Sequence, residues 1–377
     1  MLTKHIHIVS FNVPFPANYG GVIDVYYKIK WLHSLGIKVH LHCFEYGREE
    51  APELNEICET VNYYPRKKGF IYSLHYLPFI VLTRQSEELV LNLMNDDFPI
   101  LMEGLHTCFL LNDERLKHRF KIFRESNIEH EYYYHLFKIE KKFWQKIFYF
   151  IESKKLKRYE SVVRNAQLML VVSQSDANYF QRTYPQNKVA YLPSFHSSND
   201  VESIEGKGNY VLYHGNLAVA ENYHAATFIV NEIASKSKHQ FIIAGLNPPQ
   251  KLQHEIEKSN NVKLISNPEN SEMEKLIKEA HINLLLTFQA TGLKLKLLNV
   301  LFNGRFTLVN EMMLAGTGLD NLCEIANDVT SIKQKINELF ETDFSETEIE
   351  KRKVELNKNY SNANNASTLS SLVFSNR

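Results

Sequence analysis

The chain has 377 residues, of which 44% are hydrophobic and 23% charged, a composition typical of a globular protein of about two domains. Lysine and arginine total 43, as do aspartate and glutamate, so no overall charge favours nucleic acid as a partner. The four cysteines, Cys43, Cys58, Cys108 and Cys323, form no C-x-x-C pair, which excludes a disulfide framework and a zinc module.

The first residues, MLTKHIHIVSF, alternate in the manner of a strand and lack the charged and apolar regions of a signal peptide. The longest nearly apolar window, residues 70–82, is shorter than the roughly 20 residues of a membrane-spanning helix. We therefore expect a cytoplasmic protein of enzyme size without a transmembrane segment.

Short β-branched and aromatic runs alternate with helical stretches along the first half of the chain. They lie at 5–11, 38–44, 99–104, 120–125 and 168–173. A second series lies at 209–215, 240–245, 261–266, 282–288 and 305–310. Alternation of this kind predicts a parallel sheet covered by helices in each half.

The segment between the two series is polar and lacks apolar periodicity, so it reads as a linker. We expect a first α/β domain at 1–195, a linker at 196–208 and a second α/β domain at 209–345. Residues 346–377 begin as a charged helix and fade into NYSNANNASTLSS, which is poor in core-forming residues.

An irregular loop, NVPFPANYGG at 12–21, follows the first predicted strand. The next residues predict a helix whose apolar face is Val22, Val25, Tyr26, Ile29 and Leu32. Because ligands bind at the carboxyl edge of an open α/β sheet, this loop is a candidate binding site. It lacks the G-x-G-x-x-G spacing of a dinucleotide site, and the alternative is a simple turn.

The stretch TGLKLKLLNVLFNG, 291–304, directly follows the apolar run at 282–288. A strand that turns into a helix directs unpaired backbone N–H groups at one point, where a diphosphate can bind. Lys294 and Lys296 would add positive charge there, on the same face as Asn299. The alternative is a buried helix whose lysines extend to solvent.

Several segments, in order, carry a family resemblance. These are RESNIEHEYYYHL at 124–136, VVSQSDANYF at 171–180, YHGNLAVAENYHAATFIVNEI at 213–233 and FIIAGLNPP at 241–249. Together with the two α/β halves, they make the chain resemble, over nearly its whole length, the family-4-like GT-B glycosyltransferases. That group contains retaining, nucleotide-sugar-dependent enzymes that build bacterial surface polysaccharides.

The resemblance implies a GT-B fold, in which two Rossmann-like α/β/α domains face each other across a cleft. The first domain would bind the acceptor and the second the nucleotide sugar, with the C-terminal helix and tail packing back toward the first. The implied reaction moves a hexose from a nucleotide-diphosphate sugar to a glycan or lipid-linked saccharide. It needs no metal, and no cofactor besides the nucleotide sugar as co-substrate.

The resemblance and the strand-end positions together give the candidate site residues. The catalytic candidates are His106, Glu103 and Arg124. The donor-binding candidates are Gly20, Gly21, Gly215, Asn216, Thr291, Gly292, Lys294, Lys296 and Asn299. The acceptor-binding candidates are Asn18, Tyr19, Asn127, Glu129 and His130, some of which would otherwise form a capped surface turn.

The sequence also departs from the family pattern. Two glutamates usually flank the helix entry of the donor domain, and Thr291 and Asn299 occupy those positions here. An asparagine can still hydrogen-bond a ribose diol, but without the assistance of a charge. The alternatives are therefore a nucleotide-sugar epimerase of the same fold and a GT-B-like scaffold that has lost catalysis.

Histidines alternate along two of the predicted strands, at His5 and His7 and at His40 and His42. No carboxylate or cysteine completes a ligand set in the sequence pattern, so we expect no metal site. Two segments, 63–81 and 137–158, mix aromatic with basic side chains. This composition suits adhesion to an anionic membrane at its inner face; the alternative is a helix hairpin packed on the first domain.

Overall fold

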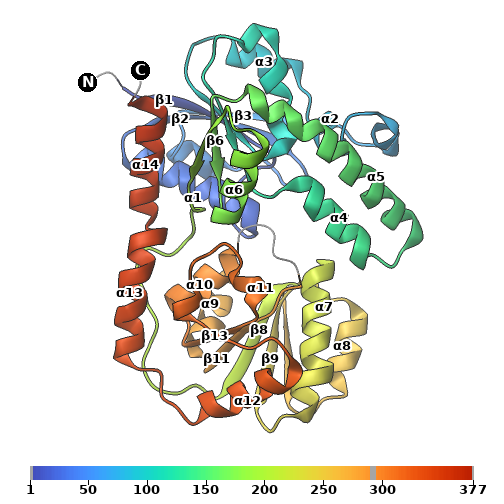
Figure 1. The fold of residues 1–377 in the computed structure, drawn as a ribbon, viewed down its shortest axis with the longest axis vertical. Helices are drawn as coiled ribbons and strands as arrows, with labels where there is room; N and C mark the ends of the chain where they lie inside the picture. The colour runs from blue at the N-terminus through green and yellow to red at the C-terminus, as the bar shows by residue number, and fades with distance from the viewer. Residues whose placement is uncertain (1–2, 289–293, 376–377) are drawn as a thin grey trace. The chain divides into compact units, whose positions relative to one another are not determined.

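The computed structural model describes residues 3–288 and 294–375. The chain forms two compact units, drawn as a ribbon in Figure 1. The first unit contains the described residues 3–197 and 360–375, and the second contains 198–288 and 294–359. Each unit is a parallel sheet with helices packed on it, as predicted from the sequence.

The sheet of the first unit has seven strands in the order β3-β2-β1-β4-β5-β6-β7. Their bounds are β1 His5–Ser10, β2 Lys38–Glu45, β3 Thr60–Pro65, β4 Ile100–Glu103, β5 Lys121–Arg124, β6 Leu168–Val171 and β7 Lys188–Tyr191. Every neighbouring pair is parallel. The strand order reverses between β1 and β4, which makes their carboxyl ends the switch point of the sheet.

Sequence analysis missed the two edge strands, β3 and β7. Their residues are mostly half-buried, so they lack the continuous apolar run that marks the strands between them. Helices pack on both faces of this sheet. They are α1 Gly20–Ser34, α2 Phe79–Leu82, α3 Glu87–Leu93, α4 Glu129–Ile139, α5 Phe143–Tyr159, α6 Gln174–Thr183 and α14 Asn362–Phe374.

The second unit has six parallel strands in the order β10-β9-β8-β11-β12-β13. Their bounds are β8 Tyr210–Asn216, β9 Gln240–Leu246, β10 Val262–Ser266, β11 Ile282–Leu285, β12 Phe306–Val309 and β13 Glu324–Ile325. The helices are α7 Ala220–Phe228, α8 Gln250–Glu257, α9 Asn270–Glu279, α10 Leu295–Asn303, α11 Glu311–Leu314, α12 Val329–Phe340 and α13 Glu346–Tyr360. Only the two-residue β13 was not anticipated.

The end of the chain is more ordered than its composition suggested. Residues 362–374 form α14, which packs on α1 within the first unit (Figure 1). Ala366, Leu369 and Val373 are buried in the core on that face of the sheet. Asn362 begins the helix and exchanges two hydrogen bonds with the backbone of His196, at 2.8 and 3.2 Å.

A chain of hydrogen bonds joins the alternating histidines of β1 and β2. Asp96 accepts from His7 Nε2 at 3.0 Å, so the Nδ1 of a neutral His7 must accept from His42 Nε2, 2.9 Å away. The Nδ1 of His42 then accepts from the Tyr64 hydroxyl at 2.8 Å, and Asn92 donates to that oxygen. In this arrangement each member donates in one direction, and both histidines are neutral.

This chain predicts that acid destabilises the protein. Burial lowers the pKa of His7 to about 4 and that of His42 well below its usual range. An unfolded chain takes up these protons as the pH falls below about 6.5, whereas the folded protein does not. The free energy of unfolding should then fall by about 2 kcal/mol per histidine between pH 7 and pH 5.

Urea unfolding at both pH values measures this loss. In His42→Gln the amide replaces both hydrogen bonds without titrating, so the pH-dependent loss should shrink by about half. His118→Gln, at an exposed histidine, serves as the control. If His42→Gln lost as much stability between pH 7 and pH 5 as the wild-type protein, the assignment of His42 as a buried neutral histidine would be contradicted.

Candidate functional site

A buried cluster of four charges lies beneath α1 in the first unit. The Nζ of Lys28 is 3.0 Å from Asp24 Oδ2 and 2.6 Å from Glu103 Oε1. Arg124 lies 3.3 Å from the same Asp24 oxygen. Two acids and two bases balance each other, which offsets the cost of burying them.

The same cluster anchors the chain after β7. Arg124 donates to the carbonyl of Leu192 at 2.6 Å, and Asp24 accepts from the backbone N–H of Phe195 at 2.7 Å. Glu103 and Arg124, expected at the reacting centre, are 2% and 0% exposed. Their contacts within the cluster give both residues a structural role in this unit.

Removing one of the two cations from the cluster should destabilise the protein, because the buried carboxylates would lose part of their charge compensation. Lys28→Met leaves Glu103 and Asp24 with one cation between them, so we expect a loss of about 3–5 kcal/mol in the free energy of unfolding. The exposed Lys30, on the same helix, provides a matched control, and Lys30→Met should change stability by less than about 0.5 kcal/mol. Chemical denaturation compares the two. A small effect of Lys28→Met would show that the cluster is not needed for folding.

His106 lies at the switch point of the first sheet, in the 3-10 helix η3 Leu105–Asn112 that follows β4. Its ring packs against Phe11, with centroids 5.2 Å apart, and its Nδ1 is 3.9 Å from Glu129 Oε1. Burial, with the nearby Arg84 and Arg66, lowers the pKa of His106 well below its usual range. The imidazole is therefore neutral at physiological pH.

Glu129 is the first residue of α4 and is 4% exposed. Burial raises its pKa to about 8, so this acid is mostly protonated at neutral pH. A neutral acid and a neutral imidazole side by side can each donate and accept hydrogen bonds from sugar hydroxyls. The sequence identified both residues, and the structure brings them together.

The loop between β1 and α1 borders this pair. Asn12 donates to the Tyr19 hydroxyl at 3.0 Å, and Arg48 donates to the side chain of Asn18. A side chain at Gly21 would place its Cβ 2.5 Å from the Phe11 ring, so this glycine gives room to Phe11. Gly20, beside it, is the first residue of α1.

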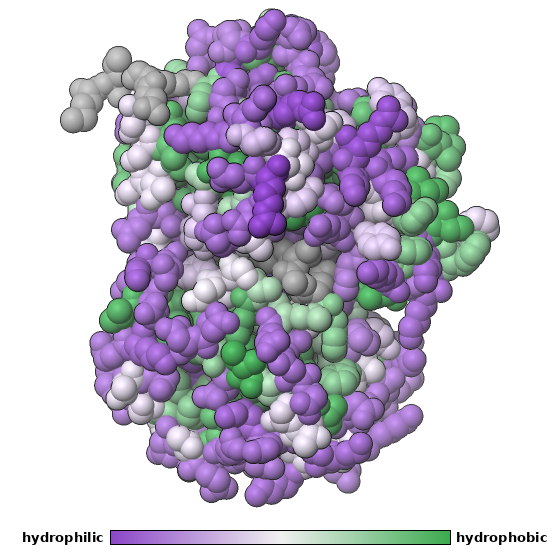
Figure 2. Space-filling model, in the orientation of Figure 1, coloured by the Kyte–Doolittle hydropathy of each residue, from purple (hydrophilic) through white to green (hydrophobic). Residues whose placement is uncertain are grey.

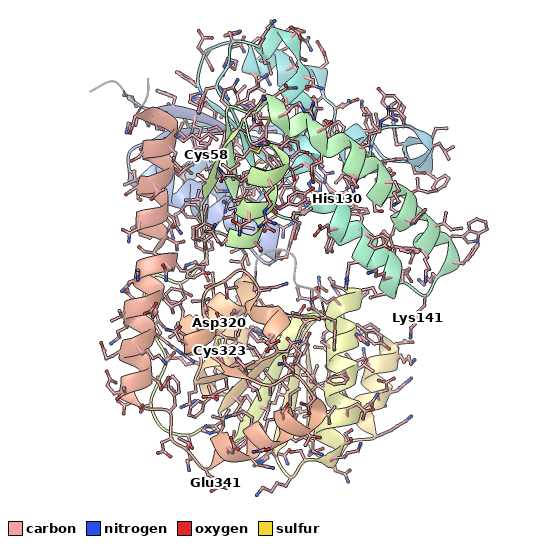
Figure 3. All side chains as sticks on the ribbon, viewed as in Figure 1. Cys58, His130, Lys141, Asp320, Cys323 and Glu341 are labelled. Carbon is pink, nitrogen blue, oxygen red and sulfur yellow. The ribbon has the colours of Figure 1, made fainter. Side chains whose placement is uncertain are left out.

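The other acceptor candidates lie further along the chain. His130, labelled in Figure 3, is 3.1 Å from Glu160 Oε2 and packs against Tyr179. These contacts direct its ring toward η5 Glu160–Asn165 and α6. Asn127 is half-buried in the bend between β5 and α4.

In the second unit the donor candidates gather at the carboxyl ends of β8 and β11. Thr291 and Gly292 lie outside the described residues. Lys294 precedes α10 and is 8% exposed. Lys296 donates to Asn222 Oδ1 at 3.1 Å and lies over the Tyr213 ring, 5.5 Å from its centroid. Burial lowers the pKa of Lys296 to about 8.

The loop after β8 and the start of α7 supply the remaining residues around Lys296. Asn222 packs close to Gly215, where a Cβ would lie 3.1 Å from its side chain, and it donates to the Asn216 carbonyl at 3.0 Å. Thr287, after β11, donates to Glu221 on α7. Asn222 and Glu221 were not singled out in the sequence, because a single Asn or Glu in a first helical turn carries no signal.

His214 is a second residue that sequence analysis did not identify. It is 5% exposed, and neither of its ring nitrogens has a hydrogen-bond partner among the described residues. Burial, with the nearby Lys296, lowers its pKa to about 3. An unsatisfied neutral imidazole beside a buried cation leaves hydrogen-bonding capacity for a ligand.

Asn299 occupies the position where the resemblance expects a glutamate. Its side-chain oxygen accepts from Asn303 Nδ2 at 2.8 Å, one turn further along α10. Among residues 3–288 and 294–375, no group of three His, Cys, Asp or Glu side chains could hold a metal ion. None of the helices in these ranges combines the length and hydrophobicity needed to cross a bilayer.

No family model matches the chain. A relative from Klebsiella pneumoniae, an uncharacterized 44.6 kDa protein in the cps region, is 27% identical over 354 residues. The match covers 86% of this chain and 87% of the relative.

Solved glycosyltransferase structures share the fold at low sequence identity. TarM aligns with a TM-score of 0.70 and 10% identity, over 98% of this chain and 99% of its own. Anabaena HepE, in complex with UDP and glucose, aligns with a TM-score of 0.67 and 10% identity, over 99% of this chain and 100% of its own. A trehalose-phosphate synthase from Burkholderia xenovorans aligns at 0.64 and 10% identity, over 98% and 99%. These likenesses confirm the GT-B fold predicted from the sequence.

Proposed function

We propose that the protein is a retaining glycosyltransferase that moves a hexose from a nucleotide-diphosphate sugar to a glycan or lipid-linked saccharide. The observation that carries this proposal is the cationic group at the entry of α10 in a GT-B fold. Lys294 and Lys296 lie there at the carboxyl edge of β11, beside the loop that follows β8. HepE, which shares the fold, is described in complex with UDP and glucose, which supports a UDP-sugar as donor.

The chemistry fits this group of residues. As the glycosidic bond to the diphosphate breaks, negative charge develops on the leaving oxygen and must be stabilised. Lys296 lies half-buried over the Tyr213 ring, where its charge is less screened than in open solvent. A bound diphosphate would favour its protonated form, and no metal is required for this compensation. His214, beside Lys296, would donate a further hydrogen bond.

In the first unit, His106 and Glu129 would receive the hexose and the acceptor. Both are uncharged at neutral pH, which suits hydrogen bonding to hydroxyl groups more than binding to charges. The relative from a cps region supports a role in surface polysaccharide synthesis.

The donor assignment predicts that Lys296→Ala weakens binding of UDP by about tenfold to a hundredfold, because one charged hydrogen bond to phosphate is lost. The melting temperature should change little, since Lys296 forms one hydrogen bond in the fold. Calorimetry with UDP, GDP, ADP, CMP and their sugars, in the presence of EDTA, measures both nucleotide choice and metal dependence.

Lys275→Ala, at an exposed lysine of the same unit, is the matched control. If Lys296→Ala and the control bound UDP equally well, the assignment of Lys296 to diphosphate binding would be contradicted. If no nucleotide binds to the wild-type protein, the noncatalytic scaffold is favoured. Sugar epimerisation without an acceptor would favour the epimerase.

We also propose that one surface of the first unit contacts an anionic membrane. Trp144 and Phe143 begin α5 and are 79% and 67% exposed, and Phe70 and Leu74 of η2 Phe70–Leu74 are 76% and 72% exposed. Lys155 of α5 donates to the carbonyl of Ser73 at 2.6 Å, which holds η2 against this helix. Hydrophobic surface follows the right-hand edge of the first unit in Figure 2, and Lys141, labelled in Figure 3, precedes α5.

Exposed aromatic side chains among lysines favour an anionic bilayer surface. The double variant Phe143→Ser and Trp144→Ser should bind phosphatidylglycerol vesicles about tenfold more weakly than wild type, because both side chains lose their contact with lipid. Vesicle co-sedimentation measures this, with phosphatidylcholine vesicles for comparison. Leu91→Ser, at another exposed apolar residue of the first unit, is the control and should retain binding. Equal binding to both lipids would contradict the proposed surface.

A further inference from the structure

Two nearly buried arginines at the carboxyl edge of the first sheet have no carboxylate partner. Arg66 follows β3 and is 8% exposed, and Arg84 follows α2 and is 4% exposed. Neither forms an ion pair with any described carboxylate, whereas the buried Arg119 and Arg124 both do. The buried Arg305 and Arg352 also lack an ion pair among the described residues, but each donates to three or more backbone carbonyls. Buried arginines are usually paired with acids, so this arrangement requires an explanation.

The protein contacts of the two side chains leave donors unused. Arg84 donates from Nε to the Phe11 carbonyl at 2.9 Å and from Nη1 to the Ile80 carbonyl at 2.8 Å. Among the described residues nothing accepts a hydrogen bond from its Nη2. Arg66 donates from Nε to Thr83 Oγ1 at 3.0 Å, and its guanidinium lies 3.9 Å from the ring centroid of Tyr46. Both arginines therefore retain capacity for an acceptor.

The groups that face the arginines do not supply a negative charge. Glu129 on α4 is an acid close enough to Arg84 to feel its charge, but burial raises the pKa of Glu129 to about 8. Tyr19, at the start of α1, and Tyr133, on α4, both have a raised pKa and stay neutral. His106 is uncharged as well. At neutral pH the edge thus holds two cations in a poorly hydrated place without a counter-charge.

We propose that Arg66 and Arg84 bind an oxyanion, a phosphoryl or carboxylate group, carried by the acceptor substrate. This inference rests on the proposed transferase function, and it names the chemical class of the acceptor. A planar guanidinium presents two parallel N–H donors to such a group, which a neutral hydroxyl cannot match. Arg84 and His106 both contact Phe11, and Arg66 lies close enough to both to act on them electrostatically. An acidic group held by the two arginines would therefore lie near His106.

The test measures binding of small anions to the full chain by calorimetry. The probes are inorganic phosphate, glucose 1-phosphate and glucuronate, with glucose as the neutral comparison. We expect at least one anion to bind more tightly than glucose and to weaken as salt is added. Arg66→Gln should weaken that binding about tenfold, and Arg66→Lys, which keeps the charge but loses the fork, less.

Arg66 is the better site for substitution because Arg84 also holds the Phe11 loop. The matched control is Arg182→Gln, at an exposed arginine of the same unit. Circular dichroism shows whether Arg66→Gln is folded. If it is not folded, the anion affinity of Arg66→Lys and the salt dependence of anion binding to the wild-type protein test the proposal instead. The relative affinities of phosphate and glucuronate distinguish a phosphoryl from a carboxylate ligand.

Two outcomes would overturn the proposal. One is that no anion binds more tightly than glucose. The other is that anion binding survives Arg66→Gln but is lost in Lys296→Ala, which would place the anion at the donor site of the second unit. UDP binding is measured in parallel and should be unaffected by Arg66→Gln. If the wild-type protein does not bind UDP, the donor assignment is refuted instead. Failure of the anion proposal and failure of the proposed transferase function can therefore be distinguished.

Discussion

The ion cluster of Asp24, Lys28, Glu103 and Arg124 is the interaction on which the first unit depends. It joins α1, β4, β5 and the chain that leaves β7, four segments distant in sequence. Apolar packing alone would allow α1 to slide on the sheet, but two acids and two bases without water have one low-energy arrangement. The cluster therefore fixes the start of α1, and with it the loop that borders His106.

The buried ion cluster and the candidate binding sites differ in the balance of their charges. In the buried cluster every charge has its partner, and the result is a rigid support. At the carboxyl edges the balance is incomplete: Arg66 and Arg84 lack an acid, and Lys296 is held by an amide and an aromatic ring. Cations without an acidic partner can bind anionic ligands, while the fully paired ion cluster keeps the unit folded.

The sequence predicted the inner strands, the two-unit α/β organisation and the GT-B fold, because buried parallel strands are continuous apolar runs. It proposed His106 and Glu129 as site residues, since both follow such strands, and the structure places their side chains 3.9 Å apart. It could not assign Glu103 and Arg124 to a structural cluster, because their partners Asp24 and Lys28 lie on a helix face that looked merely amphipathic. Arg66, Arg84 and His214 escaped notice for a similar reason. These side chains are notable because they are buried without an acidic or hydrogen-bonding partner for part of their polar groups. Burial and missing partners can be recognised only in the three-dimensional structure.

The position of α14 has a consequence for synthesis of the chain. The first unit is built from two stretches separated by the whole second unit, so the latter is in effect an insertion into the former. As the ribosome releases the protein, the part of α1 that α14 covers stays uncovered until α14, which follows the whole second unit, has been synthesised. Deletion of α14 would thus damage the unit that is made first, rather than the one made later.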